Sequence, residues 1–137
     1  MLVRQFRPPM GADTIELPAG LLDPGEDATT AALRELKEET GYSAKVVSVS
    51  PTACMSPGLT NEMVHLVYAD IDLDDPVNAV PKQHDDDAGS ITVMRVPLAQ
   101  LGAELHKFAS QGCNVWMGLF ALAAGMAAAD PGTGQKS

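Results

Sequence analysis

Residues 20–42 read GLLDPGEDATTAALRELKEETGY, and this stretch predicts one acidic helix with a loop before it and a stop after it. Pro24 lacks an amide donor and Gly25 tolerates left-handed dihedral angles, so both residues belong to the loop. Asp27 can cap the amino end of the helix, and Gly41 can end the helix in a left-handed conformation. We therefore expect a helix between Asp27 and Gly41.

The predicted helix carries three carboxylates on one side. Glu35, Glu38 and Glu39 follow the spacing i, i+3 and i+4, which places their side chains together on a helix. Like charges at this spacing repel by roughly 0.2–0.5 kcal/mol per pair, so a hard divalent cation with oxygen ligands is the expected partner. Arg34 can neutralise part of the cluster. The other side of the helix is apolar and comprises Ala32, Leu33, Leu36 and Thr40.

The alternative interpretation is a solvated surface helix rich in Glu and Lys. The spacing of the stretch argues against it: Gly20, five residues, Glu26, seven residues, and then RELKEETGY at 34–42. Each residue type occurs at about one position in ten to fifteen, so a chance match at seven positions is very rare. The pattern matches the Nudix box, and the chain resembles a Nudix hydrolase.

Composition limits the classes of partner. The chain has 137 residues, and we expect one domain over residues 1–129 with a disordered tail at 130–137. A net charge of -9 and a pI near 4.5 argue against nucleic-acid and membrane partners, which are polyanionic. The two cysteines, Cys54 and Cys113, form no disulfide framework, and the amino end lacks a signal-peptide pattern. These features favour the cytoplasm, with the nucleus as the alternative.

The remaining segments suggest alternating strands and helices. Residues 2–6 and 14–17 are expected to pair as a hairpin, and residues 63–73 to form a long central strand in which His65 is a core or cross-strand residue. Residues 74–90 contain five aspartates and form either a solvated loop or a functional lid. The other expected elements are strands at 44–50 and 91–96, a helix at 98–110, and an apolar run at 115–129 suited to helix packing or a partner surface.

Three further segments narrow the resemblance. They are RQFRPP at 4–9, ELPAG at 16–20 and CMSPGLTNE at 54–62, and together they resemble the eukaryotic ADP-sugar (ADP-ribose) pyrophosphatases over residues 2–96. The resemblance implies an α+β fold, namely a Nudix α/β/α sandwich with a mixed sheet, here N-terminally truncated. It also implies magnesium-dependent hydrolysis of the pyrophosphate of ADP-ribose or a related ADP-sugar to AMP and a sugar phosphate, with Mn²⁺ as an alternative ion. A homodimer is expected if the missing N-terminal region is not essential.

The same resemblance implies roles for individual residues. Arg7 alone would be interpreted as a surface arginine rather than a phosphate clamp, and the resemblance reverses that preference. The implied metal ligands are the Ala19 carbonyl, Glu35, Glu38 and Glu39. Glu38 and Glu39 are also expected to be catalytic. The implied substrate-binding residues are Arg7, Glu16, Met55, Gly58 and Leu59. Glu26 and Arg34 would brace the loop and the helix.

The general base is the least defined part of the expected site. In the family a glutamate precedes the last sheet strand, and here Gly89 or Ser90 falls at that place. Asp85, Asp86 or Asp87 would have to reach instead, and Asp87 is the candidate, although proton transfer needs a contact of about 3 Å.

Two other functions stay open. One is a non-catalytic subunit that binds nucleotide diphosphates or takes part in assembly, and the other is a Nudix enzyme that acts on a different nucleoside diphosphate derivative. The complete carboxylate set favours an enzyme.

Overall fold

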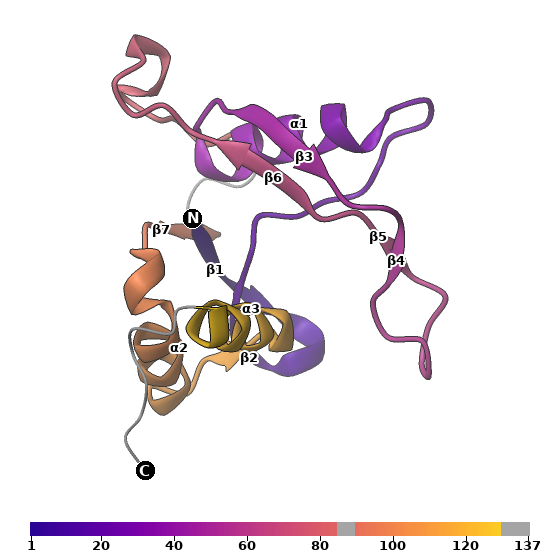
Figure 1. Cartoon of the computed structure of the whole chain (residues 1–137), viewed down its shortest axis with the longest axis vertical. Coiled ribbons are helices and arrows are strands. Elements are labelled where there is room, and N and C mark those ends of the chain that lie inside the picture. Colours follow the sequence, from indigo (N-terminus) through magenta and orange to yellow (C-terminus); the bar gives the residue numbers. More distant parts are fainter. Residues whose placement is uncertain (85–89, 130–137) are drawn as a thin grey trace. The chain divides into compact units, whose positions relative to one another are not determined.

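The computed structural model describes residues 1–84 and 90–129, which fall into two compact units (Figure 1). The first unit comprises residues 1–17 and 89–137, and the second comprises residues 18–88. The expectation of one domain over residues 1–129 stays a prediction, and residues 130–137 lie outside the described part. None of the helices in the described ranges has the length and apolar content needed to cross a membrane.

The first unit is built on a four-stranded mixed sheet in the order β7-β1-β2-β8. β1 (Leu2–Arg7) pairs antiparallel with β2 (Ala12–Glu16) and with β7 (Ile91–Met94), whereas β8 (Asn114–Val115) runs parallel to β2. The turn between β1 and β2 is the short 3₁₀ helix Pro8–Met10, which ends at Gly11 with φ 60°. Two prolines with fixed φ and a glycine that accepts positive φ explain this tight turn. The predicted hairpin is therefore confirmed.

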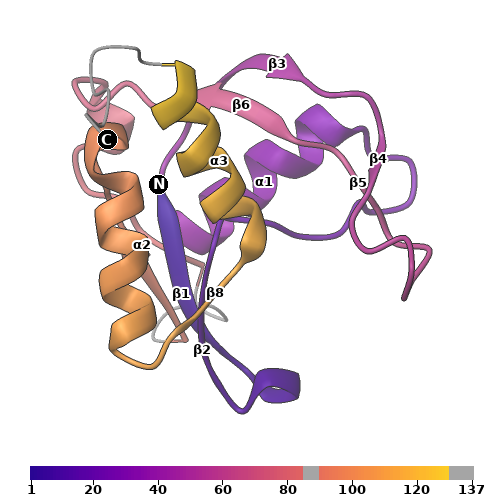
Figure 2. The ribbon, with the colours of Figure 1, turned by 60° about the horizontal axis from the view of Figure 1, so that its bottom comes forward.

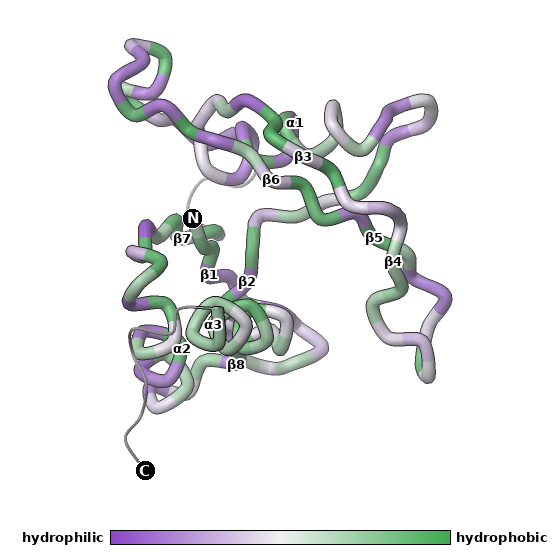
Figure 3. The backbone as a smooth tube through the Cα atoms, in the orientation of Figure 1, coloured by the Kyte–Doolittle hydropathy of each residue, from purple (hydrophilic) through white to green (hydrophobic). Residues whose placement is uncertain are grey.

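Two helices cover an apolar core in this unit. α2 (Leu101–Ser110), preceded by the 3₁₀ turn Leu98–Gln100, contacts α3 (Met117–Ala129), and Figure 2 shows both helices beside the strands of the sheet. α3 is apolar over its whole length (Figure 3), because Ala, Leu, Met and Phe dominate it. The buried core comprises Leu2, Ile15, Leu101, Leu105, Cys113 and Leu119. The predicted strands and helices of this unit are all present.

The second unit contains the acidic helix, α1 (Ala28–Thr40). α1 contacts β3 (Lys45–Val49) and β6 (Val67–Asp70), which form an antiparallel pair with an irregularity between Val46 and Ser48. A second, shorter pair joins β4 (Ala53–Cys54) to β5 (Met63–Val64), and a 3₁₀ turn spans Pro76–Asn78.

The expected long central strand at 63–73 is wrong. It is divided into β5 and β6, each pairing with one other strand, and the break falls at His65 and Leu66. Side chains make contacts at the break: His65 Nδ1 lies 3.0 Å from the Ser50 carbonyl oxygen, His65 Nε2 lies 3.1 Å from Thr52 Oγ1, and the Leu66 amide donates to Ser50 Oγ at 2.9 Å. His65 is thus a cross-strand residue, as expected, but its side chain takes the place of ladder hydrogen bonds.

Candidate metal and diphosphate site

α1 begins and ends at the residues that the sequence predicts. Asp27 Oδ1 accepts a hydrogen bond from the Thr30 amide at 2.8 Å, and this bond holds the pKa of Asp27 below its usual value. At the other end Gly41 has φ 77°, and its amide donates to the Lys37 carbonyl at 2.8 Å. Both caps are local, which is why they could be predicted.

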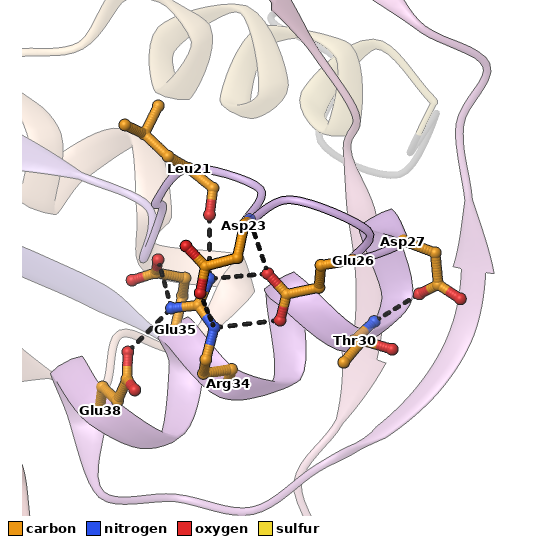
Figure 4. A network of polar contacts seen from close by, with 8 residues as sticks. All are labelled: Leu21, Asp23, Glu26, Asp27, Thr30, Arg34, Glu35 and Glu38. Carbon is orange, nitrogen blue, oxygen red and sulfur yellow. Dashed lines mark hydrogen bonds and ion pairs between the residues drawn. The ribbon is translucent and has the colours of Figure 1, made fainter.

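Arg34 is the centre of a network of acidic side chains (Figure 4). Its guanidinium donates two hydrogen bonds to Glu26, at 3.0 and 2.9 Å, and one to the Leu21 carbonyl at 2.9 Å. Nη1 also donates to Glu35 at 2.7 Å and to Glu38 at 3.0 Å. One cation therefore ties the loop before α1 to two of the three clustered carboxylates.

The network fixes charge as well as position. Hydrogen bonding to Arg34 holds the pKa of Glu26 below its usual value, helped by the Asp23 amide, which donates to Glu26 at 3.0 Å. The pKa of Arg34 is raised further above its already high value by Glu26 first and then by Glu35. Both groups are therefore charged at neutral pH, and their contacts join the loop before α1 to the helix.

Glu35 and Glu39 pack against Gly20 and Ala19, which precede the loop before α1. A Cβ atom added at Gly20 would lie 1.9 Å from Glu35 Cδ, so only glycine leaves room for the Glu35 carboxylate. Glu39 is buried, with 7% of its surface exposed, and its Oε2 accepts a hydrogen bond from the Ala19 amide at 3.1 Å. The structure thus brings Ala19 and Gly20 to the carboxylate side of α1.

The donor set suits a hard divalent cation by its chemistry, because carboxylate and carbonyl oxygens are the ligands such ions take. In their present rotamers, however, Glu35 and Glu38 bind Arg34 and Glu39 binds the Ala19 amide. Within residues 1–84 and 90–129, no three acidic, histidine or cysteine groups converge closely enough to hold an ion. Binding a metal ion would require Glu35 and Glu38 to turn from the guanidinium toward the ion.

Arg7 and Glu16 meet in the first unit. Arg7 Nε and Nη2 donate to the two carboxylate oxygens of Glu16 at 3.0 and 2.8 Å, in the two-point geometry that a guanidinium also offers to phosphate. Thr14 Oγ1 donates to the same carboxylate. Hydrogen bonding from Arg7 is the main cause that lowers the pKa of Glu16, and burial opposes it. The two residues named as substrate-binding therefore form an ion pair.

The other residues named as substrate-binding lie on the connection between β4 and β5. Met55 is 36% exposed and Leu59 is 89% exposed, and the Leu59 amide donates to the Ser56 carbonyl at 2.9 Å in a turn that contains Gly58. No hydrogen bond or ion pair recorded for the described residues joins this turn to the carboxylate cluster. The structure does not bring these three residues together with α1. Asp85, Asp86, Asp87 and Gly89 lie outside the described residues, so no position is given for the general base.

Some contacts could not be identified from the sequence. The Leu21 carbonyl and the Asp23 amide take part in the Arg34 network through their main chains, which carry no sequence signal. From far along the chain, Gln83 contacts Glu39 in the last turn of α1, and Asn78, which is buried at 5% exposure, contacts Ser43 just after the helix. Nothing in the sequence distinguishes Asn78 or Gln83 from the other polar residues of their loop.

The acidic helix, its capped ends and the glycine-containing loop before it follow the spacing of the Nudix box. Residues 1–112 match the protein family described as NUDIX domain, so the chain belongs to the Nudix family. Hydrolases of this family generally use a divalent metal ion.

Particular relatives agree with the narrower resemblance. The chain is 47% identical over 112 residues to a protein of Saccharomyces cerevisiae named ADP-ribose pyrophosphatase, covering 82% of this chain and 48% of that protein. It is 46% identical over 113 residues to a mouse protein named ADP-sugar pyrophosphatase, and the match covers 77% of this chain and 52% of that protein. A Caenorhabditis elegans protein named putative nudix hydrolase 2 is 46% identical over 127 residues, and the match covers 92% of this chain and 57% of that protein. The chain thus spans about half the length of the relatives it matches.

Proposed function

We propose that this chain catalyses magnesium-dependent hydrolysis of the pyrophosphate bond of ADP-ribose or a related ADP-sugar, giving AMP and a sugar phosphate. The observation that supports it best is the carboxylate cluster of α1 braced by Arg34, with Gly20 packed against Glu35. The names of the yeast and mouse relatives, ADP-ribose pyrophosphatase and ADP-sugar pyrophosphatase, point to the same substrate class.

In this proposal Glu35, Glu38, Glu39 and the Ala19 carbonyl hold the ion. Mg²⁺, when bound, neutralises the anionic oxygens of the diphosphate and lowers the pKa of a water molecule that attacks phosphorus. Mn²⁺ offers the same coordination chemistry as an alternative. Arg34 keeps the loop and helix in register while Glu35 and Glu38 exchange their contacts with it for the ion.

Arg7 binds the substrate phosphate with the two nitrogens that now contact Glu16. Before substrate binds, Glu16 restricts the guanidinium through these two hydrogen bonds. Part of the side-chain entropy is therefore already lost when phosphate replaces the Glu16 carboxylate. Met55, Gly58 and Leu59 supply an adaptable turn for the rest of the substrate. The proposal includes a homodimer in the cytoplasm or nucleus that has neither nucleic-acid nor membrane partners.

Incubating the protein with ADP-ribose and Mg²⁺, and measuring AMP and ribose 5-phosphate, tests the proposal. We expect both products in equal amounts and none after chelation of the metal. Binding of ADP-ribose without release of AMP would instead support the non-catalytic subunit. Hydrolysis of a different nucleoside diphosphate derivative alone would support the third function.

Asp87 is the proposed general base in this scheme. Replacing it in Asp87→Asn removes the proton acceptor without changing the size of the side chain, so we expect the maximal rate to fall about 100-fold or more with little change in KM. Steady-state rates for Asp85→Asn and Asp86→Asn provide the comparison. A similar rate for Asp87→Asn and the wild type would remove Asp87 from this role.

A further inference from the structure

The carboxyl end of α1 is closed by a segment from far along the chain. We call residues 78–84 the strap, because they lie against the last turn of α1 and the residues that follow it. The last four carbonyl groups of any helix lack partners within the helix. In α1 these groups include the carbonyls of Glu38 and Glu39, two of the residues assigned to the metal ion.

The strap supplies both of the missing donors. The Gln83 side-chain amide, Nε2, donates to the Glu39 carbonyl at 2.7 Å, and the His84 main-chain amide donates to the Glu38 carbonyl at 2.8 Å. In a continuing helix these carbonyls would accept from Ser43 and Tyr42. The Ser43 amide donates instead to Asn78 Oδ1 at 2.8 Å. The strap therefore replaces the next helical turn.

Close packing holds the strap in place. A Cβ atom added at Gly41 would lie 2.3 Å from the Lys82 main-chain nitrogen, so the two backbones are in direct contact. Asn78 is buried and uses its side-chain amide fully, because Nδ2 donates to the carbonyls of Ser43 at 3.0 Å and Asp72 at 2.8 Å. The strap is thus attached at two points, Asn78 and residues 83–84.

Glu39 is consequently held by hydrogen bonds to both its main chain and its side chain. Its main-chain carbonyl accepts from Gln83, and its side-chain carboxylate accepts from the Ala19 amide. Lys37, two residues earlier, makes its own contact through Nζ with the Gly41 carbonyl at 2.8 Å. Loss of the Gln83 contact would loosen the last turn at Glu39, while the Asp27 cap at the other end of α1 stays in place.

We propose that Gln83 is a positioning residue for the metal ion: through the Glu39 carbonyl it fixes the last turn of α1 so that Glu38 and Glu39 can bind the ion together. This inference rests on the proposed metal-binding function. Groups that orient metal ligands without touching the metal typically contribute 10–100-fold to metal affinity.

The test measures binding of Mn²⁺ to the full chain directly. Electron paramagnetic resonance detects free Mn²⁺, and the decrease of this signal on adding protein gives the amount of ion bound. The relevant site is the one that Glu39→Gln removes. In Gln83→Met, which keeps the length of the side chain and removes the donor, we expect Mn²⁺ to bind about tenfold more weakly. The melting temperature of the metal-free protein should fall only slightly.

Two controls separate positioning from general destabilisation. Asp27→Ala removes the cap at the opposite end of α1, so it should lower the melting temperature and leave Mn²⁺ affinity within twofold of the wild type. Gln100→Met makes the same chemical change at an exposed residue whose side chain makes no capping hydrogen bond. It should change neither quantity.

Mn²⁺ affinity within twofold of the wild type in Gln83→Met would overturn the inference, as would an equal loss in Asp27→Ala or absence of Mn²⁺ binding by the wild type. A wild-type protein that binds Mn²⁺ but leaves ADP-ribose intact would refute the proposed hydrolysis alone. In that case the Gln83→Met comparison still decides the role of Gln83.

Discussion

Glu39 is the residue whose replacement tests the metal site most cleanly. Glu39→Gln removes one negative ligand, yet the remaining side-chain oxygen can still accept the hydrogen bond from the Ala19 amide at 3.1 Å. We therefore expect metal-dependent turnover to disappear while the fold survives. Activity assays and circular dichroism measure the two effects, and an unchanged rate would remove Glu39 from the metal ligands.

Gly20 tests the packing behind Glu35. In Gly20→Ala the new methyl group would occupy the space of the Glu35 carboxylate and displace it from the residues before α1, whose Ala19 carbonyl is assigned to the same ion. We expect at least tenfold weaker metal binding, of the size caused by displacing a ligand. Gly125→Ala is the matched control, since nothing lies within 4 Å of a Cβ at that position. Equal metal affinity in the two variants, measured by titration calorimetry, would contradict this account of Gly20.

At the scale of the element, α1 was predictable because its determinants are local. The Asp27 cap, the Gly41 stop and the spacing of the glutamates all lie within one short stretch. The partners of the α1 carbonyls were not predictable, because Gln83 lies 44 residues from Glu39 and loop residues carry no periodic pattern. Residues 63–73 illustrate the same limit: their apolar pattern predicts an extended chain, and the side-chain contacts of His65 and Ser50 at the break depend on residues distant in the sequence.

The carboxyl end of α1 allows a comparison of two glycines. Gly41 and Gly25 have φ of 77° and 86°, so alanine is strained at both. That strain costs about 1–3 kcal/mol. Only Gly41 also has main-chain atoms of Pro81 and Lys82 in the path of a Cβ. We therefore expect Gly41→Ala to lower the free energy of unfolding by clearly more than Gly25→Ala does, as measured by urea denaturation. Equal losses of unfolding free energy in the two variants would mean that the strap moves aside for the added methyl group at little cost.

For the whole molecule, acid should destabilise the folded state. The pKa values of Glu16, Glu26 and Asp27 are all lowered by hydrogen bonds in the folded protein, from ordinary values of 4.5, 4.5 and 3.8. Their contribution is therefore fully present above those ordinary values, and it is lost as the pH falls through the folded pKa values. Protonation also relieves repulsion in a chain of net charge -9, which opposes the effect.

Replacing one group isolates its part of this pH dependence. In Glu26→Gln the side chain no longer titrates, so the free energy of unfolding should fall less steeply between pH 5 and pH 3 than in the wild type. Urea denaturation at several pH values measures the slopes. The same slope in both proteins would show that the contact between Glu26 and Arg34 does not persist in solution.

The position of the Arg34 guanidinium among the carboxylates of α1 has a consequence for how the protein folds and takes up an ion. Because Arg34 already compensates Glu26, Glu35 and Glu38, the newly made chain does not have to wait for a cation before its acidic residues can come together. Loading then becomes an exchange of one positive group for another. If these carboxylates hold the ion as proposed, folding does not depend on the supply of metal, and the ion can leave and return without unfolding of the protein.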